Sequence, residues 1–140
     1  MSAIRKLNRV LIIDDSELVG TKVGDLIRSI PGIDYLGQAK TVKSGLKICA
    51  EKNPDIVFLD IKLPDGNGKD VLIELKKNYP EITVIMLTNF DSDFHKQKFA
   101  ELGADNFLDK TRDFNRIINN SSPRITFERF SRDRSRCSSR

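Results

Sequence analysis

Short apolar runs that lead directly into acidic side chains constrain this chain more than any other feature. Residues 10–13 are aliphatic without a break and lead into Asp14 and Asp15, and the run at 56–59 leads into Asp60. Segments that are apolar at every position, rather than at alternate ones, are typical of strands buried on both faces. Two adjacent carboxylates repel each other, and burying them costs free energy unless a positive charge compensates. We therefore expect these acids either to cap a helix or to bind a cation.

Strand-like apolar segments alternate with helical amphipathic segments along the first 120 residues. Proline and glycine separate them; for example, Pro31-Gly32 ends the first helix and Asn53-Pro54 ends the second. We predict strands over residues 9–15, 33–40, 55–63, 82–89 and 106–111, and helices over residues 16–30, 42–53, 69–80, 92–103 and 112–119. Because strands and helices alternate, we expect an α/β fold, a doubly wound five-stranded parallel sheet with helices on both faces.

The net charge of +4 belongs to the C-terminal tail rather than to the predicted domain. The chain has 24 basic and 20 acidic residues; residues 121–140 contain six arginines and two acids, so residues 1–120 hold 18 of each sign. The tail is rich in Ser and Arg, and Pro123 ends any continuing helix. We expect a domain over residues 1–120 and a disordered basic tail over residues 121–140. The alternative is a basic arm that contacts an acidic partner or nucleic acid.

Composition excludes several classes of protein. Hydrophobic residues make up 39% of the chain, which is too high for general disorder, and no run approaches the roughly 20 apolar residues of a membrane span. The N-terminal residues lack the apolar core of a signal peptide, so we expect a cytoplasmic protein without membrane contact. Two cysteines form no disulfide framework; Cys49 fits an apolar helical pattern and Cys137 lies in the tail. His95 has no second ligand at metal-binding spacing, and we interpret it as a surface residue.

The predicted strand ends place chemically active groups at one edge of the sheet. Ligands of parallel α/β sheets bind beyond the carboxyl ends of the strands. At these ends the sequence has Asp14, Asp15, Asp60, Thr88 and Lys110. A carboxylate cluster favours a hard cation such as Mg²⁺, and a neighbouring lysine and hydroxyl suit a phosphoryl group. The set predicts phosphoryl transfer with Asp60 as the nucleophile, which would form an aspartyl phosphate.

Some of these residues also have a purely structural interpretation. Asp15 or Ser16 could cap the first helix, and the acid pair alone does not separate capping from metal binding. Together with Asp60 and Lys110, the pair favours metal binding. Gly66 and Gly68 serve a turn and lack the strand–glycine–helix arrangement of a nucleotide loop, so we exclude nucleotide binding.

Taken in order, these motifs resemble the receiver domains of bacterial two-component response regulators, and in particular the single-domain chemotaxis type. The residues that carry the resemblance are the pair Asp14-Asp15, FLDIKLPDGNG with Asp60 and Pro64, MLT with Thr88, and LGADNFLDK with Phe107 and Lys110. They cover roughly residues 8–118, and four motifs in order are far more specific than any one of them. The family implies a flavodoxin-like sheet with strand order 2-1-3-4-5.

The resemblance implies a role for each residue of the acidic site. Asp60 would accept a phosphoryl group from a sensor histidine kinase or a histidine phosphotransfer protein. Mg²⁺ would be bound by Asp15 directly, by Asp14 mainly through water, by Asp60, and by the backbone carbonyl of Lys62. Lys110 would contact the phosphoryl group.

The resemblance also implies a conformational switch. Thr88 would move to donate a hydrogen bond to a phosphoryl oxygen, and Phe107 would turn inward into the space left behind. The face formed by the fourth helix, the fifth strand and the fifth helix would change shape. A downstream target protein would dock there, and two phosphorylated copies could dimerise.

Residues near the expected phosphoryl group bear on its lifetime. Asn89 stands where the family usually has a small residue, and Lys62 and Phe90 flank the route of the hydrolytic water in the family. We therefore expect slow self-dephosphorylation rather than a turnover enzyme. One alternative is a Mg²⁺-dependent phosphohydrolase using Asp60, but Lys62 stands where such enzymes usually carry a second Asp for proton transfer. The other is nucleic-acid binding through the arginine-rich tail; because residues 1–120 are neutral overall, this alternative rests on the tail alone.

Overall fold

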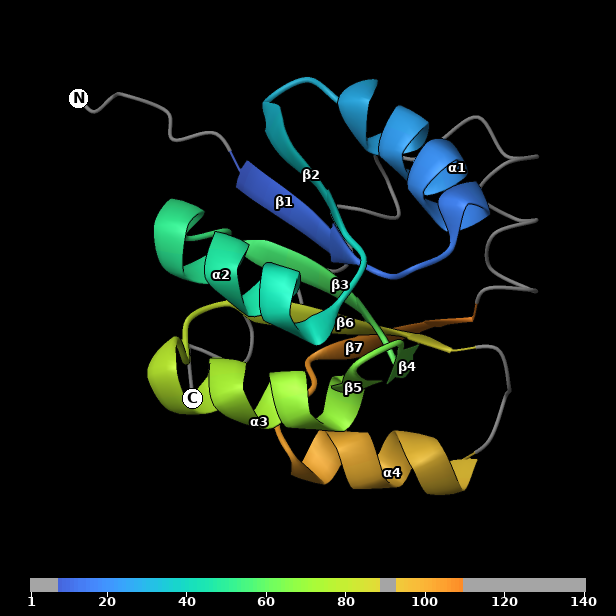
Figure 1. Ribbon diagram of the computed structural model, residues 1–140, viewed down its shortest axis with the longest axis vertical. Coiled ribbons are helices and arrows are strands. Elements are labelled where there is room, and N and C mark those ends of the chain that lie inside the picture. The colour runs from blue at the N-terminus through green and yellow to red at the C-terminus, as the bar shows by residue number, and fades with distance from the viewer. Residues whose placement is uncertain (1–7, 89–92, 110–140) are drawn as a thin grey trace.

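The computed structural model describes residues 8–88 and 93–109, which form a five-stranded parallel sheet with helices packed on it (Figure 1). The strands lie in the order β2-β1-β3-β6-β7, and all neighbouring strands are parallel. Counted along the chain within this sheet, the order is 2-1-3-4-5, so the predicted fold is confirmed. The elements of this layer structure are β1 (Asn8–Ile13), α1 (Glu17–Arg28), β2 (Ile33–Ala39), α2 (Val42–Lys52), β3 (Ile56–Asp60), α3 (Gly68–Asn78), β6 (Thr83–Thr88), α4 (Asp93–Glu101) and β7 (Asn106–Asp109).

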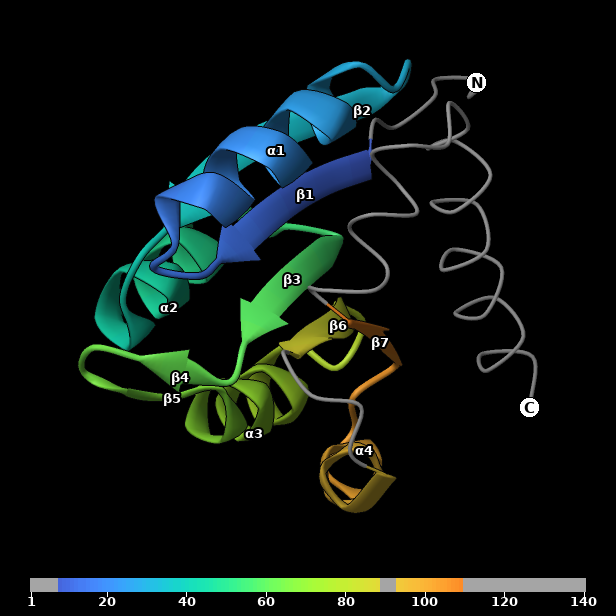
Figure 2. The ribbon, with the colours of Figure 1, turned by 90° about the vertical axis from the view of Figure 1, so that its right-hand side faces the viewer.

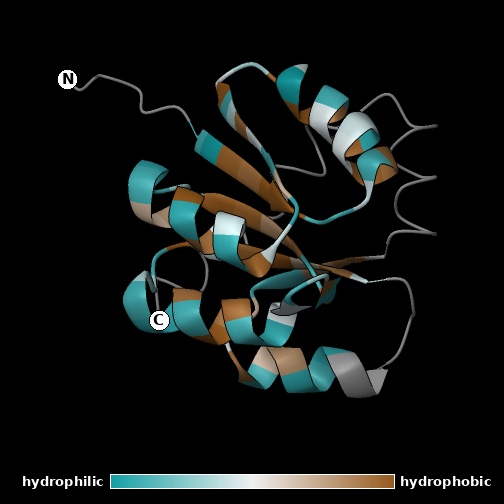
Figure 3. Cartoon of the chain, viewed as in Figure 1, coloured by the Kyte–Doolittle hydropathy of each residue, from teal (hydrophilic) through white to brown (hydrophobic). Residues whose placement is uncertain are grey.

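The helices cover both faces of the sheet. One apolar cluster joins the strands to α1 through residues such as Val23 and Ile27. The other joins them to α2, α3 and α4 through Cys49, Leu72 and Phe99. In Figure 3 the strands between the helices are hydrophobic along most of their length, whereas the helices carry both hydrophilic and hydrophobic residues. The burial of these apolar side chains is the main force that holds the layers together.

The first strand shows why its sequence is apolar without a break. Successive side chains of a strand point to opposite faces. Val10 and Ile12 therefore belong to the cluster beneath α1, and Leu11 and Ile13 belong to the cluster on the other face. All four are completely buried, because helices cover the sheet on both sides.

The predicted end of the third strand, at residue 63, was wrong. β3 stops at Asp60 rather than continuing to residue 63, and a small antiparallel hairpin follows, formed by β4 (Lys62–Leu63) and β5 (Gly66–Asn67). Two-residue strands are too short to leave a periodic pattern in the sequence. Figure 2 shows the hairpin extending from the carboxyl end of β3 beside α3. The helix predicted over residues 112–119 lies outside the described residues.

Three helices begin at the same edge of the sheet, each after a polar capping residue. Ser16 caps α1, Thr41 caps α2 and Asn67 caps α3, and each side-chain oxygen accepts a hydrogen bond from a backbone N–H in the first turn. The partial positive charge of these helix ends therefore lies at the carboxyl edge of the sheet, where it favours anions. None of the helices in the described ranges is long and apolar enough to cross a membrane.

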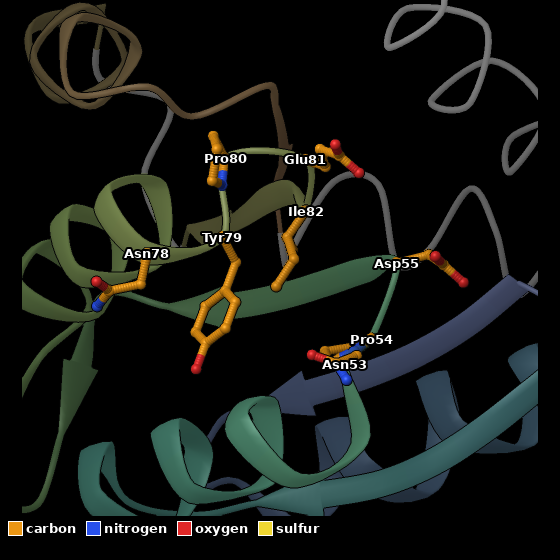
Figure 4. A pocket seen from close by; sticks show the side chains of 8 residues that line it. All are labelled: Asn53, Pro54, Asp55, Asn78, Tyr79, Pro80, Glu81 and Ile82. Carbon is orange, nitrogen blue, oxygen red and sulfur yellow. The ribbon is translucent and has the colours of Figure 1, made fainter.

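A cavity of about 390 Å³ lies at the opposite edge of the sheet, where the chain enters β3 and β6 (Figure 4). Its lining consists of Asn53, Pro54, Asp55, Asn78, Tyr79, Pro80, Glu81 and Ile82. The lining contains none of the site residues predicted from the sequence. The predicted site residues that the structure describes therefore lie away from this cavity.

Candidate functional site

Three carboxylates meet at the carboxyl edge of the sheet, in the turn after β1 and at the end of β3. One oxygen from each of Asp14, Asp15 and Asp60 lies within 4.8 Å of the other two. Asp14 is fully buried, Asp60 is 8% exposed, and Asp15 is exposed to solvent. The arrowheads of β1 and β3 end at the same side of the sheet in Figure 2. The parallel pairing of these two strands therefore gathers acids that are more than 40 positions apart in the sequence.

Backbone N–H groups orient two of the three carboxylates. Asp14 Oδ1 accepts a hydrogen bond from Ser16 N at 2.8 Å, and Asp60 Oδ1 accepts one from Ile61 N at 2.7 Å. The N-cap of α1 is Ser16, whose Oγ accepts a hydrogen bond from the first turn. Of the two residues that could cap this helix, Ser16 is therefore the one that does so. Helix capping does not account for the position of Asp15.

The carboxylate cluster has the chemistry of a cation site. Like charges at this distance repel, and the removal of two of the three groups from water strengthens the repulsion. A divalent cation bound between them offsets it. Carboxylate oxygens are the hard ligands that Mg²⁺ prefers, and Mg²⁺ keeps part of its shell for water and phosphate. The acidic pocket formed by Asp14, Asp15 and Asp60 therefore fits a Mg²⁺ ion.

Thr88 lies next to this cluster in the register of the sheet. Asp60 pairs with Leu87, so Thr88 is one residue further along the neighbouring strand β6. The residue is only 3% exposed, and its Oγ1 has no hydrogen-bond partner among the described residues. The Thr83 hydroxyl, at the opposite end of β6, shares this property. It is the position beside the acids that distinguishes Thr88.

The structure describes two of the three remaining predicted site residues. Phe107 in β7 is partly buried and packs against the apolar cluster beneath α2, α3 and α4. Lys62 is exposed in β4. Lys110 lies outside the described residues, as do residues 89–92 and 121–140.

Three residues that the sequence did not assign to the site hold its loops. Gly68, at the start of α3, approaches the Asp60 carbonyl so closely that a Cβ would lie 2.1 Å from the oxygen. Asp65 in the hairpin accepts hydrogen bonds from the first two backbone N–H groups of α2, at 2.7 and 3.1 Å. Gln38 in β2 donates to two carbonyls of the loop after β1. The partners of Asp65 and Gln38 lie 22 to 24 residues away, so no local pattern marks them.

This chain is similar in sequence to known response regulators over most of its length. The family model of the response regulator receiver domain matches residues 10–121. The response regulator GacA of Pseudomonas viridiflava is 31% identical over 102 residues, which cover 73% of this chain and 48% of GacA. The response regulator VraR of Staphylococcus saprophyticus is 29% identical over 103 residues, 74% of this chain and 49% of VraR. The chain thus spans about half the length of the curated relatives it matches.

Solved structures show the same fold. The response regulator domain of Thermotoga maritima CheB has a TM-score of 0.78 at 24% identity, covering 92% of this chain and 97% of that domain. Phosphoryl acceptance in phosphorelay signalling is the general function of such receiver domains. Since the family model spans most of the chain and the sheet has the receiver strand order, this protein belongs to the response regulator receiver domain family.

Proposed function

We propose that this receiver domain accepts a phosphoryl group on Asp60 in a Mg²⁺-dependent reaction and passes its phosphorylation state to a partner protein. The donor would be a phosphohistidine on a sensor histidine kinase or a histidine phosphotransfer protein. The observation that carries the proposal is the cluster of Asp14, Asp15 and Asp60, with oxygens within 4.8 Å of one another. The relatives GacA and VraR, both response regulators by name, support the same assignment.

The carboxylate of Asp60 is the nucleophile in this proposal. The backbone N–H of Ile61 orients it by donating a hydrogen bond to Oδ1 at 2.7 Å. A new O–P bond forms while the P–N bond of the phosphohistidine breaks, and the imidazole keeps the electron pair and takes a proton from solvent. Asp14, Asp15, Asp60 and the backbone carbonyl of Lys62 would hold Mg²⁺, which neutralises charge on the phosphoryl oxygens when it is bound.

The response to phosphorylation would begin at Thr88. A buried hydroxyl without a partner costs about 1–3 kcal/mol, and a hydrogen bond from Oγ1 to a phosphoryl oxygen would recover part of that cost. Lys110 would contact the same phosphoryl group. As Thr88 moves, Phe107 would turn inward. Phe107 lies on β7, where it pairs with Met86, two residues before Thr88 on β6. We expect the surface of α4 and β7 to transmit this change to a target protein.

The test is intact mass measured after incubation with acetyl phosphate and Mg²⁺. We expect the wild type to gain one phosphoryl group of about 80 Da, because a small acyl phosphate can replace the kinase as donor. Asp60→Asn should gain nothing, and a chelator should abolish the gain in the wild type. Asp70→Asn, which changes an exposed acid at the start of α3, is the matched control and should react like the wild type.

Two outcomes would contradict the assignment. Phosphorylation that persists in Asp60→Asn would place the acceptor elsewhere, and release of inorganic phosphate in many turnovers would favour the phosphohydrolase. Deletion of residues 121–140 separates the remaining alternative, because nucleic-acid binding through the tail would disappear while phosphorylation stayed intact. A complex with beryllofluoride offers a second check, because the receiver domain of Klebsiella pneumoniae RstA was solved as BeF₃-activated. That domain is 26% identical to this chain, with a TM-score of 0.68, and the match covers 74% of this chain and 86% of that domain.

The lifetime of the phosphorylated form is a separate prediction. We expect it to last minutes or longer in purified protein with Mg²⁺, because Lys62 and Phe90 are large residues at positions that flank the water route in the family. Lifetime is measured by removing acetyl phosphate and following the loss of the phosphorylated mass. Lys62→Ala should shorten it. Decay of the wild type within seconds would show that these side chains do not restrict water.

A further inference from the structure

Gln38, near the end of β2, holds the loop that carries Asp15. Its amide nitrogen Nε2 donates to the backbone carbonyl of Asp14 at 2.6 Å and to that of Ser16 at 2.8 Å. A side-chain amide has two N–H donors, so both are used on the two carbonyls that bracket Asp15. The backbone on either side of Asp15 is therefore fixed by one side chain from the neighbouring strand.

A bulge in β2 directs Gln38 to this loop. The regular pairing of β2 with β1 holds up to Tyr35, after which the register shifts and Leu36 has no partner in β1. Because side chains alternate along a strand, Tyr35 and Gln38 would point to opposite faces of a regular strand. The extra residue brings both to the face covered by α1. Gly37 permits the bulge, since its φ of +115° suits glycine rather than other residues.

Helix α1 leaves room for this side chain at Gly20. A Cβ built on Gly20 would lie 1.8 Å from Gln38 Oε1, so any larger residue displaces the amide. Gly24, one turn further along α1, faces Tyr35 in a comparable way, with its Cβ 2.9 Å from the hydroxyl oxygen. Tyr35 pairs with Val10, which precedes the loop that carries Asp14 and Asp15. The two glycines therefore form a matched pair, one packed against Gln38 and one packed away from the acids.

We propose that Gln38 is a positioning residue for the Mg²⁺ site and that it acts by setting the direction of the Asp15 carboxylate. Asp14 and Asp60 are buried and each accepts a backbone hydrogen bond. Within the described residues no hydrogen bond orients the exposed carboxylate of Asp15, so its direction follows from its backbone. The inference rests on the proposed function in one respect, namely that this acidic cluster binds Mg²⁺.

The test removes the two hydrogen bonds of Gln38 in two independent ways. Gln38→Met keeps the length of the side chain without its donors, Gly20→Ala displaces the same amide, and Gly24→Ala is the control. Each full-length protein is phosphorylated with acetyl phosphate over a range of Mg²⁺ concentrations, and direct Mg²⁺ binding is measured by calorimetry. We expect the half-saturating Mg²⁺ concentration to rise about tenfold in the first two variants, which is the usual effect of losing a residue that orients a metal ligand.

The rate at saturating Mg²⁺ separates positioning from general damage. It should stay within about twofold of the wild type, because Gln38 acts on the affinity of the ion and not on the reacting atoms. The Gln38→Met, Gly20→Ala double variant should be no worse than either single one, because both remove the same interaction. Gly24→Ala should leave the Mg²⁺ dependence unchanged.

Other results would overturn the proposal. A lower free energy of unfolding in Gln38→Met with an unchanged Mg²⁺ midpoint would show that Gln38 only stabilises the fold. If Gln38→Met does not fold, the Mg²⁺ midpoint of Gly20→Ala decides instead. If the wild type binds Mg²⁺ but is not phosphorylated, the proposed function fails while the calorimetric comparison still tests Gln38. If the wild type binds no Mg²⁺, both proposals fail.

Discussion

Residue 68 must be a glycine because of what lies opposite it and not because of its backbone angles. Its φ is not among the positive values found in this chain. A Cβ at Gly68 would lie 2.1 Å from the carbonyl oxygen of Asp60 and 3.2 Å from Cα of Ile61, and both of these are backbone atoms. Gly68 N also donates to Ile61 O at 2.6 Å. The sequence pattern predicts a turn at Gly68, but Gly68 is the first residue of α3 and closes the loop after Asp60 against the strand.

Gly68→Ala should therefore weaken both the fold and the phosphoryl site. We expect the free energy of unfolding to fall by about 1–3 kcal/mol, because backbone atoms must move to admit the methyl group. Phosphorylation of Asp60 should slow as its carbonyl is displaced. Gly66→Ala is the control, since its Cβ would meet only the Val42 side chain at 3.1 Å. Urea unfolding and the rate with acetyl phosphate measure the two effects, and equal behaviour of the two variants would contradict this account.

At the scale of elements, two separate segments cap the start of α2. Thr41 and Ser44 form a reciprocal capping box, with Thr41 Oγ1 accepting from Ser44 N at 3.0 Å. Asp65 supplies the other acceptor, because its carboxylate takes the N–H groups of Val42 and Lys43. The hairpin that follows Asp60 is in this way fastened to a helix on the same face of the sheet.

Asp65 makes the strength of this connection depend on pH. The hydrogen bond from Val42 N, with a smaller contribution from Lys43 N, lowers the pKa of Asp65 below its ordinary value of 3.8. A lowered pKa means that the ionised form stabilises the fold, fully above the ordinary value and progressively less as the pH falls through the folded-state value. Asp65→Ala should lower the thermal midpoint near neutral pH, and its difference from the wild type should shrink below pH 3.8.

Thermal unfolding followed by circular dichroism across this pH range measures the effect. Glu51→Ala, which removes an exposed acid near the other end of α2, is the control and should show little difference at any pH. A difference between Asp65→Ala and the wild type that stays constant down to the lowest pH would show that the charge of Asp65 is not what fastens the hairpin.

The elements that could be predicted were those with a local signal. The apolar runs before Asp14 and Asp60 identified β1 and β3 and placed the acids at their ends, because burial on both faces leaves an unbroken apolar pattern. The hairpin of β4 and β5 has no such pattern. Gln38 could not be identified either, because regular alternation puts it on the wrong face until the bulge is known. Long-range hydrogen bonds decide these positions, and a single sequence does not record them.

For the molecule as a whole, Cys49 reports on the integrity of the core. It is completely buried in the cluster between the sheet and α2, α3 and α4, and burial raises the pKa of its thiol to about 12. A thiol that is both inaccessible and protonated does not react with disulfide reagents. In a Cys137→Ser background, which leaves Cys49 as the single cysteine, labelling near neutral pH should be limited by unfolding of the domain.

Labelling with a chromogenic disulfide reagent tests this prediction. The reaction should be complete at once in concentrated urea and should be slower by several orders of magnitude in native buffer, at a rate that follows the equilibrium between folded and open forms. Rapid labelling in native buffer would show that the α2 side of the core opens locally without unfolding of the sheet.

The bulge in β2 also has a consequence for how copies of the domain meet one another. Within the described residues β2 pairs with β1 alone, so it forms an edge of the sheet (Figure 1). An open edge is a template on which a strand of another molecule can form hydrogen bonds, and proteins commonly interrupt such edges. The unpartnered Leu36 breaks the even spacing of donors and acceptors along this seven-residue strand. The same bulge directs Gln38 to the loop that carries Asp15. We expect it to protect the domain from edge-to-edge aggregation as well.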